Sequence, residues 1–422
     1  MTEPCIYCGE RKPFTAEHVV SAGIGGDDPD WMLTDCVCGD CNTRVFSPLE
    51  NKIFRSSPLA LARIFLQPHT RGRTGKSSAP IMQPRASYHD DAQTGIMFEQ
   101  VMRAGGEPVM LPQIAIAPGG KLLANIPDVE TGKAFIAAVK DRLVTRIRLV
   151  QKIRDGVEAR FNQTMLEWVD NATGYQVTDE RESTLKAPDE PVIWVEEPVW
   201  PAGVEEGDYT RLPPRVFQRE RGQISCRAAS IRIVAGLLSI LHVGIDQIAI
   251  PDNAQPVAAQ AHVHPQLSFD IKSYDRVLAK IGMNICAKLI GADFVRQSGF
   301  NRVRDYIRTG EGAIMKRPVT DNDQARSALG PQLKNHHVFM ICGGPGKDAD
   351  SQCAVFFCRL YGGPIEIFRL AEFPARQREL NEPRVVVVDY IVERITSMSL
   401  ADYALFAVQN ALAPIEDFFA GV

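Results

Sequence analysis

The residues with the clearest chemical potential lie at the start of this 422-residue chain. Cys5 and Cys8 form one Cys-x-x-Cys pair, and Cys38 and Cys41 form a second. A Cys-x-x-Cys turn presents two thiolates from one tight backbone knuckle, so two such turns close a tetrahedral site for one Zn²⁺. The spacing therefore predicts a structural zinc ion held by these four cysteines.

Two other ligand sets remain open at this point. In the run CVCGDC, Cys36 could replace Cys38, although the knuckle would then have a different geometry. His18, which lies between the two cysteine pairs, could replace one of the cysteines as a zinc ligand. That second alternative would leave one thiol without a role.

Further polar residues stand between and directly after the cysteine pairs. Glu17 precedes His18, and Asn42 follows Cys41. Carboxylate and amide oxygens suit hard divalent cations, whereas thiolates suit zinc, so ligand type can sort two metals in one module. We expect Glu17 and Asn42 to bind Mg²⁺ or Mn²⁺, with His18 as a general base that activates water. This chemistry suits the hydrolysis of a phosphodiester bond.

The run CIYCGERKPFTAEHVV, the later GG and CVCGDCN together resemble the HNH nuclease family. The similarity is to the subgroup with a four-cysteine zinc site and EH in place of DH, and it covers about the first 55 residues. It implies a ββα-metal fold in which a strand carries the histidine and a helix follows the second strand. Position by position, it implies that His18 is the general base, while Glu17 and Asn42 are ligands of the catalytic divalent ion. The implied products carry a 5′-phosphate and a 3′-hydroxyl.

One position departs from the family pattern. The family's middle asparagine is expected about nine residues before Asn42, where this chain has Leu33. The departure keeps open a second interpretation, in which the protein binds nucleic acid through a zinc knuckle and does not cleave it.

Charge is unevenly distributed along the chain, whose formal net charge is −4. Between Thr43 and Ala86 there are eight Lys or Arg residues and one acid, Glu50. Such a block predicts a local DNA-binding face, although a solvated helix surface would have the same composition. For Glu50 a helix-face salt bridge is favoured over a metal contact. The candidate phosphate contacts are Arg44, Lys52, Arg55, Arg71, Arg73 and Lys76.

The composition is that of a globular protein, with 45% hydrophobic and 23% charged residues. No run of 18 apolar residues predicts a membrane span, and the N-terminus lacks the apolar stretch of a secretory signal. Outside the N-terminal region the cysteines lie in apolar surroundings, as in QCAVFFCRL. We therefore expect a cytoplasmic protein with reduced thiols.

The pattern of elements predicts an α+β protein. Residues 1–85 would form the nuclease module with a basic connector, and residues 86–422 a larger mixed α/β domain of unknown role, with a sub-boundary near 215. A helix is expected from Cys41 with a break at Ser56–Pro58, and a long helix over 132–161 from apolar residues at three- and four-residue steps. The run 352–370 predicts a hairpin around its YGG turn.

These inferences define the expected function. The module would be a DNA endonuclease that makes nicks, so that a double-strand break requires a homodimer or two successive nicks. The larger domain would decide when or where cleavage occurs, through a regulatory ligand or partner. By analogy, a role in phage defence or in mobile elements would suit such an enzyme.

Overall fold

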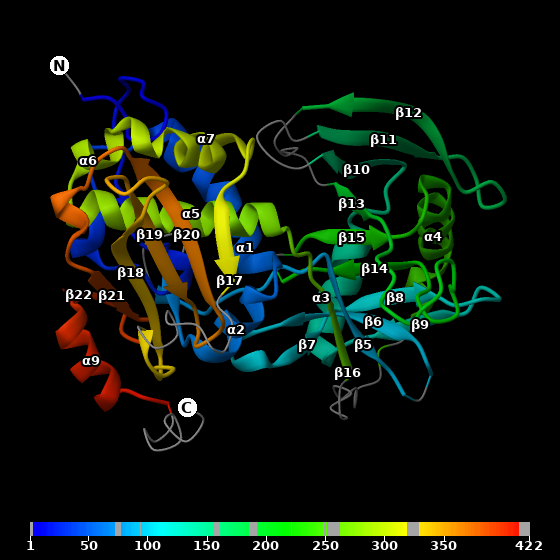
Figure 1. Cartoon of the computed structure of the whole chain (residues 1–422). Coiled ribbons are helices and arrows are strands. Elements are labelled where there is room, and N and C mark those ends of the chain that lie inside the picture. Colours follow the sequence, from blue (N-terminus) through cyan, green and yellow to red (C-terminus); the bar gives the residue numbers. More distant parts are fainter. Residues whose placement is uncertain are drawn as a thin grey trace. The chain divides into compact units, whose positions relative to one another are not determined.

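The computed structural model of the chain describes residues 3–71, 77–92, 94–154, 160–184, 192–220, 222–248, 250, 262–318 and 329–412. The fold combines helices and strands in an α+β architecture, as predicted, and divides into two compact units (Figure 1). Unit 1 comprises Met1–Met82, Ala104–Gly106 and Ser268–Val422, and unit 2 comprises Gln83–Arg103 and Glu107–Leu267. The chain thus leaves unit 1 close to residue 85 and returns to it for its last third. None of the helices in the described ranges is long and apolar enough to cross a membrane.

The N-terminal part of unit 1 is a two-stranded sheet followed by a helix. Strand β1 (Glu17–His18) pairs antiparallel with β2 (Met32–Leu33), so that Glu17 faces Leu33 and His18 faces Met32 in register. The π-helix η3 (Asp40–Phe46) continues into α1 (Ser47–Ser56), and α2 (Leu59–Leu66) follows. Short elements complete this part: η1 (Ala22–Ile24), η2 (Pro29–Trp31), β3 (Thr70–Arg71), β4 (Ser77–Ser78) and η4 (Ala104–Gly106).

The predicted helix from Cys41 and its break near Pro58 are both confirmed. Ser57 leaves the helical conformation with φ −104° and ψ 173°. Its hydroxyl donates to the carbonyl oxygen of Ile53 and accepts the backbone N–H of Leu59, at 2.6 and 3.2 Å. The serine therefore ends α1 and starts α2, because one side chain satisfies backbone groups of both helices.

The rest of unit 1 is a six-stranded antiparallel sheet with helices. The strand order is β17 (Met315–Pro318), β20 (Ile365–Phe373), β19 (Gln352–Arg359), β18 (His336–Pro345), β21 (Arg384–Asp389) and β22 (Arg394–Ser399). The helices are α5 (Ile271–Leu289), α6 (Ala292–Arg296), η6 (Ser298–Phe300), α7 (Asn301–Thr309), η7 (Arg378–Leu380) and α9 (Leu400–Gln409). The predicted hairpin over 352–370 is confirmed as β19 and β20.

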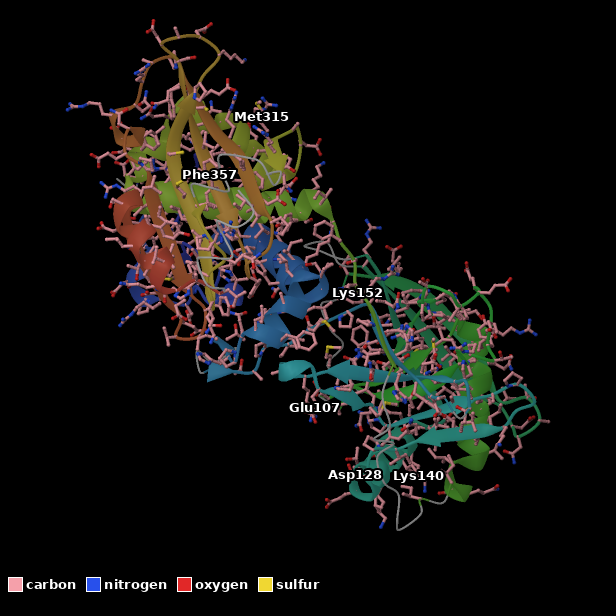
Figure 2. All side chains as sticks on the ribbon, turned by 60° about the horizontal axis from the view of Figure 1, so that its bottom comes forward. Glu107, Asp128, Lys140, Lys152, Met315 and Phe357 are labelled. Atoms are coloured by element: carbon pink, nitrogen blue, oxygen red, sulfur yellow. The ribbon has the colours of Figure 1, made fainter. Side chains whose placement is uncertain are left out.

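Side chains on β18 alternate between two cores. Phe339 and Ile341 belong to a core that includes α5, whereas Val338 and Met340 pack with Tyr403 of α9. Successive strand residues point to opposite faces, so α5 and α9 cover opposite faces of the sheet. Figure 2 labels Met315 on β17 and Phe357 on β19 within this sheet.

The core on the α5 side extends to the N-terminus. Cys5, Val19 and Leu33 belong to the same buried cluster as Leu278 and Ile281 of α5. The N-terminal ββα segment is therefore packed with a helix that follows it by more than 200 residues in the sequence. Cysteine spacing and the family resemblance predicted the N-terminal module, but they could not predict its contact with α5.

Unit 2 contains an eight-stranded and a four-stranded sheet. The larger sheet has the order β12 (Tyr175–Ser183), β11 (Arg160–Trp168), β10 (Arg146–Arg154), β13 (Ile193–Glu196), β15 (Ile224–Arg227), β14 (Arg215–Gln218), β8 (Gln113–Ile116) and β9 (Leu122–Asn125). The smaller has the order β16 (His262–Gln266), β5 (Ala86–Asp90), β6 (Met97–Met102) and β7 (Pro108–Met110). Helices α3 (Val129–Lys140) and α4 (Ile231–Gly244), followed by η5 (Ile245–Gln247), pack their apolar residues against the larger sheet.

The predicted helix over 132–161 is confirmed up to Lys140 and is wrong beyond it, where residues 146–154 and 160–161 lie in strands. Helix α3 begins after Asp128, whose carboxylate accepts the Thr131 N–H at 2.8 Å, and ends at Lys140; both end residues are labelled in Figure 2. The chain then forms β10, in which buried Ile147 and Leu149 alternate with arginines. The apolar residues of this run are compatible with the period of a helix and with that of a strand. Residues 146–154 form a strand because they pair with β11 and β13.

Candidate metal centre and the surroundings of His18

The four predicted zinc ligands are brought together. The Sγ atoms of Cys5, Cys8, Cys38 and Cys41 all lie within 4.8 Å of one another, and those of Cys8 and Cys38 are 3.7 Å apart. A tetrahedral ion with Zn–S bonds of about 2.3 Å separates its sulfur ligands by about 3.8 Å. The cluster can therefore hold a structural zinc ion. Cys36 and His18 lie outside this group of ligand atoms, so the four-cysteine set is favoured over both alternatives.

Hydrogen bonds prepare one of these thiols for metal binding. The Cys38 N–H donates to Cys5 Sγ at 3.4 Å. The hydrogen bond from the Cys41 thiol, assisted by backbone N–H groups, lowers the pKa of Cys5 to about 4, although burial opposes it. Burial raises the pKa of Cys8 to about 11. Zinc binding would therefore release protons from the other thiols, because the metal binds thiolates.

His18 lies at the edge of the two-stranded sheet and faces Asp27. Its Nε2 atom is 3.6 Å from Asp27 Oδ1, and the two side chains are 20% and 22% exposed. Gly26 brings the Asp27 loop close to β1, because a side chain there would collide with the Val20 carbonyl. The pair is an imidazole beside a carboxylate and is partly open to solvent. The carboxylate faces Nε2 of the ring, so it can stabilise a charged imidazole but does not orient the ring from the opposite nitrogen as in a catalytic triad. Sequence reasoning found His18 and missed Asp27.

Glu17 lies on the buried side of β1 and has an ammonium partner. Its carboxylate forms an ion pair with Lys280 of α5, which also pairs with Glu50. The Lys280 side chain is 2% exposed, and its Nζ lies 5.3 Å from the centre of the Phe46 ring. Burial raises the pKa of Glu17, while the charge of Lys280 opposes that shift. Glu50 thus makes the predicted salt bridge, but with a residue distant in sequence; it also accepts a hydrogen bond from Ser21 at 2.5 Å.

Asn42 joins the start of the helix to the segment that leads into β1. Its Nδ2 donates to the Ala16 carbonyl at 2.9 Å and to Thr15 Oγ1 at 3.2 Å. The Glu17 carboxylate already binds the Lys280 ammonium, which would repel a second cation at short range. The residues present therefore do not fit a divalent cation held between Glu17 and Asn42.

Helix α5 supplies further contacts that the sequence did not predict. Asn284 donates to the His18 carbonyl at 3.0 Å and accepts the Tyr7 hydroxyl at 2.6 Å. Lys288, one turn further on, reaches the Met32 carbonyl at 3.4 Å. Lys280, Asn284 and Lys288 are spaced by four, so they share one face of the helix. The four-residue spacing of these polar residues within an apolar helix is the sequence signal that could have identified their shared face.

The position of the family's middle asparagine belongs to the core. Leu33 is buried, packs in the cluster that contains the thiols, and pairs with Glu17 across the two strands. An apolar residue at this position stabilises the sheet that carries His18, and it offers no polar group to the loop.

The predicted phosphate contacts are partly engaged by acids. Arg44 is 70% exposed but lies 3.4 Å from Asp40, and Lys52 donates to Asp270 at 2.6 Å. The hydrogen bond from Lys52 lowers the pKa of Asp270. Arg55 lies in the last turn of α1 and Arg71 in β3, whereas Arg73 and Lys76 are outside the described residues.

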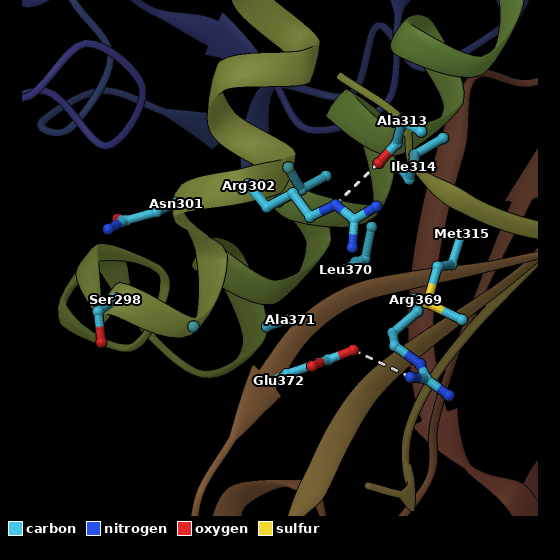
Figure 3. A pocket seen from close by; sticks show the side chains of 12 residues that line it. Ser298, Asn301, Arg302, Ala313, Ile314, Met315, Arg369, Leu370, Ala371 and Glu372 are labelled. Atoms are coloured by element: carbon cyan, nitrogen blue, oxygen red, sulfur yellow. Dashed lines mark hydrogen bonds and ion pairs between the residues drawn. The ribbon is translucent and has the colours of Figure 1, made fainter. Parts of the chain in front are cut away.

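A cavity of about 290 Å³ lies elsewhere in unit 1, between α7, β17 and β20 (Figure 3). Arg302 donates to the Ala313 carbonyl at 2.9 Å, and Arg369 pairs with Glu372 at 2.9 Å. Ile314 and neighbouring apolar side chains complete its lining. A regulatory ligand of the C-terminal region stays a prediction.

Comparison with known proteins finds no matching family model, no matching curated protein and no matching solved structure. The resemblance to the HNH nucleases therefore depends on the residues of the first 55 positions alone.

Proposed function

We propose that this protein is a zinc-braced endonuclease that hydrolyses phosphodiester bonds of DNA with His18 as the general base. The observation that carries the proposal is the partly exposed pair of His18 and Asp27, in the same N-terminal segment as the cluster of four thiols. The order of two short strands and a helix, with the histidine on the first strand, agrees with the ββα-metal fold that the sequence resemblance implies.

In this proposal each group has one chemical role. Nε2 of His18 takes a proton from a water molecule, and the water oxygen attacks the phosphorus atom. The bond from phosphorus to the 3′ oxygen breaks, and this leaving oxygen takes a proton from the solvent, which gives a 5′-phosphate and a 3′-hydroxyl. The carboxylate of Asp27, 3.6 Å away, stabilises the imidazolium that forms. The zinc ion would hold the cysteine turns that frame β1 and the helix, and would not contact the substrate.

Nicking of a supercoiled plasmid in the presence of Mg²⁺ or Mn²⁺ tests this assignment. His18→Ala should lower the nicking rate by about 10²–10⁴, the usual contribution of a general base. Asp27→Asn should lower it less, because the imidazole remains. His264→Ala, in β16 of unit 2, is the matched control and should nick like the wild type. Equal rates for His18→Ala and the control would contradict the assignment, provided that all variants retain zinc.

A second function is favoured by two observations. Glu17 is paired with Lys280 and Leu33 is buried, so two positions of the family pattern are used for packing. These observations suit a zinc-knuckle protein that binds nucleic acid without cleaving it. Gel-shift binding of the same plasmid fragments, with no cleavage under either divalent ion, would favour this second function.

A further inference from the structure

The loop that carries Asp27 is rich in glycine. This glycine loop, residues 23–28, has the sequence GIGGDD and leads from η1 into η2. Glycine has the greatest backbone freedom of all residues, so the sequence of the loop does not by itself fix the place of Asp27. The distance of 3.6 Å between Asp27 Oδ1 and His18 Nε2 therefore depends on contacts from other parts of unit 1.

Gln67, the residue that follows α2, contacts the glycine loop at two backbone groups. This glutamine is 2% exposed. In the orientation that gives each donor an acceptor, its amide nitrogen donates to the Gly23 carbonyl at 3.2 Å and its amide oxygen accepts the Gly25 N–H at 2.9 Å. One buried side chain thus both donates to and accepts from the same short stretch of backbone, which fixes the position and the direction of the loop.

Tyr361, in the turn between β19 and β20, connects this glutamine to the six-stranded sheet. The Gln67 amide nitrogen also donates to the Tyr361 hydroxyl oxygen, 3.0 Å away. The Tyr361 N–H donates to Nδ1 of the buried His337 on β18 at 3.0 Å. The centre of the Tyr361 ring lies 4.3 Å from that of His337 and 5.3 Å from that of Tyr390. The amide of Gln67 is therefore itself held in place by residues of the sheet.

The other end of the glycine loop is held by separate contacts. Asp28 Oδ2 accepts the Ile395 N–H at 2.8 Å in a buried hydrogen bond, and Asp28 Oδ1 accepts the Asp30 N–H at 3.0 Å. Tyr390 lies so close to Gly25 that a side chain at Gly25 would collide with it. The backbone is thus fixed on both sides of Asp27, at Gly25 and at Asp28. Such support by buried hydrogen bonds is what precise placement of a functional side chain requires.

We propose that Gln67 is a positioning residue for the pair of His18 and Asp27. Gln67 acts through the backbone of the glycine loop, and it holds the Asp27 carboxylate against the imidazole. Without the amide, the Gly23 carbonyl and the Gly25 N–H lose a shared partner, the loop gains freedom, and the carboxylate moves away from His18. The value of this placement for cleavage rests on the proposed function, but the placement itself does not.

NMR spectra of the zinc-loaded full-length protein, labelled with ¹⁵N in its histidines, test the placement without any cleavage. The His18 ring signals are assigned from their loss in His18→Ala, and Asp27→Asn shows where they move when the carboxylate is removed. Gln67→Met keeps the volume of the side chain and removes the amide, so it should shift the His18 ring signals toward their positions in Asp27→Asn.

Two further variants make the spectra decisive. Tyr361→Phe removes only the hydroxyl that holds the Gln67 amide, so it should shift the His18 signals in the same direction by less. Gln163→Met, at a glutamine of β11 that is 3% exposed, is the matched control and should leave the His18 signals where they are in the wild type. Zinc content and circular dichroism establish which variants are folded.

Single-turnover cleavage of DNA shows whether Gln67 acts through Asp27. Gln67→Met and Asp27→Asn should each lower the rate by about tenfold, with unchanged DNA affinity, because the carboxylate is misplaced in one and neutral in the other. The double variant should match Asp27→Asn to within about twofold, since two changes that remove one interaction are not additive. A merely structural loss would multiply with that of Asp27→Asn.

Two results would overturn the proposal: unchanged His18 signals in folded Gln67→Met, or a double variant in which the two losses multiply. If Gln67→Met does not fold, unchanged His18 signals in Tyr361→Phe would overturn it instead. Shifted His18 signals in Gln67→Met, with no cleavage by any variant or by the wild type, would support the positioning role and remove only the proposed hydrolysis.

Discussion

At the scale of residues, Glu17 and His18 are neighbours in the sequence with opposite surroundings. Because side chains alternate along a strand, β1 directs His18 toward Asp27 near the surface and Glu17 toward Lys280 in the core. The sequence resemblance identified both positions but could not tell which one faces solvent. It located the thiol cluster fully, because ligand spacing in a Cys-x-x-Cys turn is a local property. Asp27 could not be found, because its position beside His18 depends on tertiary packing.

The zinc assignment is tested by two cysteines that lie two positions apart. Cys38→Ser should lose zinc and several kcal/mol of the free energy of unfolding, since metal-binding energy contributes directly to folding. Cys36→Ser should retain zinc, because Cys36 lies outside the ligand group. Zinc per chain, measured by inductively coupled plasma mass spectrometry, and thermal unfolding check both variants. Equal zinc loss in the two variants would contradict the four-cysteine set.

The buried residue His337 should make the free energy of unfolding depend on pH. Burial lowers the pKa of this residue to about 3, and its Nδ1 accepts the Tyr361 N–H at 3.0 Å. Below the ordinary histidine pKa of about 6.5, the unfolded chain binds a proton that the folded chain does not. The free energy of unfolding should therefore fall by up to about 1.4 kcal/mol per pH unit between about pH 6.5 and 3, with no contribution above pH 6.5.

Urea unfolding at pH 7, 6 and 5 measures this slope, and His337→Gln separates it from the titration of other groups. The variant should lose less stability on acidification than the wild type. Identical slopes for the two proteins would show that His337 does not carry the effect.

At the scale of elements, α5 completes the N-terminal segment. It supplies the counter-ion of Glu17, a hydrogen bond to the His18 backbone and apolar residues of the shared core. The helix after Cys41 and the β19–β20 hairpin were predictable from local sequence patterns. The end of α3 at Lys140 was not, because the apolar spacing of residues 132–161 suits both a helix and a strand, and only the neighbouring strands decide between them.

Lys280 and Lys288 give a matched test of α5, since they share one face of the helix. Lys280→Met should cost about 3–5 kcal/mol of the free energy of unfolding, because two carboxylates lose their buried counter-ion. Lys288 is exposed and makes one long contact, so Lys288→Met should change stability by less than about 0.5 kcal/mol. Urea unfolding measures both variants. The double variant Lys280→Met with Glu17→Gln should recover part of the lost free energy of unfolding, because one of the unpaired carboxylates is then removed. Similar losses for the two single variants would contradict the role of Lys280.

At the scale of the whole molecule, the chain forms its first unit from both of its ends. The change of composition near residue 85 predicts a domain boundary there. Composition does not indicate which later segment of the chain packs against the N-terminal segment. The mixed α+β class was predictable because segments with a helical period of apolar residues alternate along the sequence with segments that have a strand period. The assembly of the N-terminal segment with α5 and the six-stranded sheet depends on contacts between residues far apart in the sequence.

A fragment of residues 1–85 should therefore fail to form a stable module. It lacks Lys280 and Asn284, so Glu17 would lose its counter-ion and Tyr7 its hydrogen-bond partner. With one equivalent of zinc, the fragment should give a poorly dispersed proton–nitrogen NMR correlation spectrum outside the cysteine turns. A fully dispersed spectrum would show that the N-terminal segment folds alone.

In the proposed function, His18 activates water for cleavage of a phosphodiester bond. Its most direct measurement is the single-turnover cleavage rate of an end-labelled DNA duplex by zinc-loaded wild type and His18→Ala, with saturating protein and Mn²⁺. The cleavage rate of His18→Ala should be at least about 100-fold lower than that of the wild type, with unchanged DNA binding. Equal cleavage rates in the two proteins would contradict it.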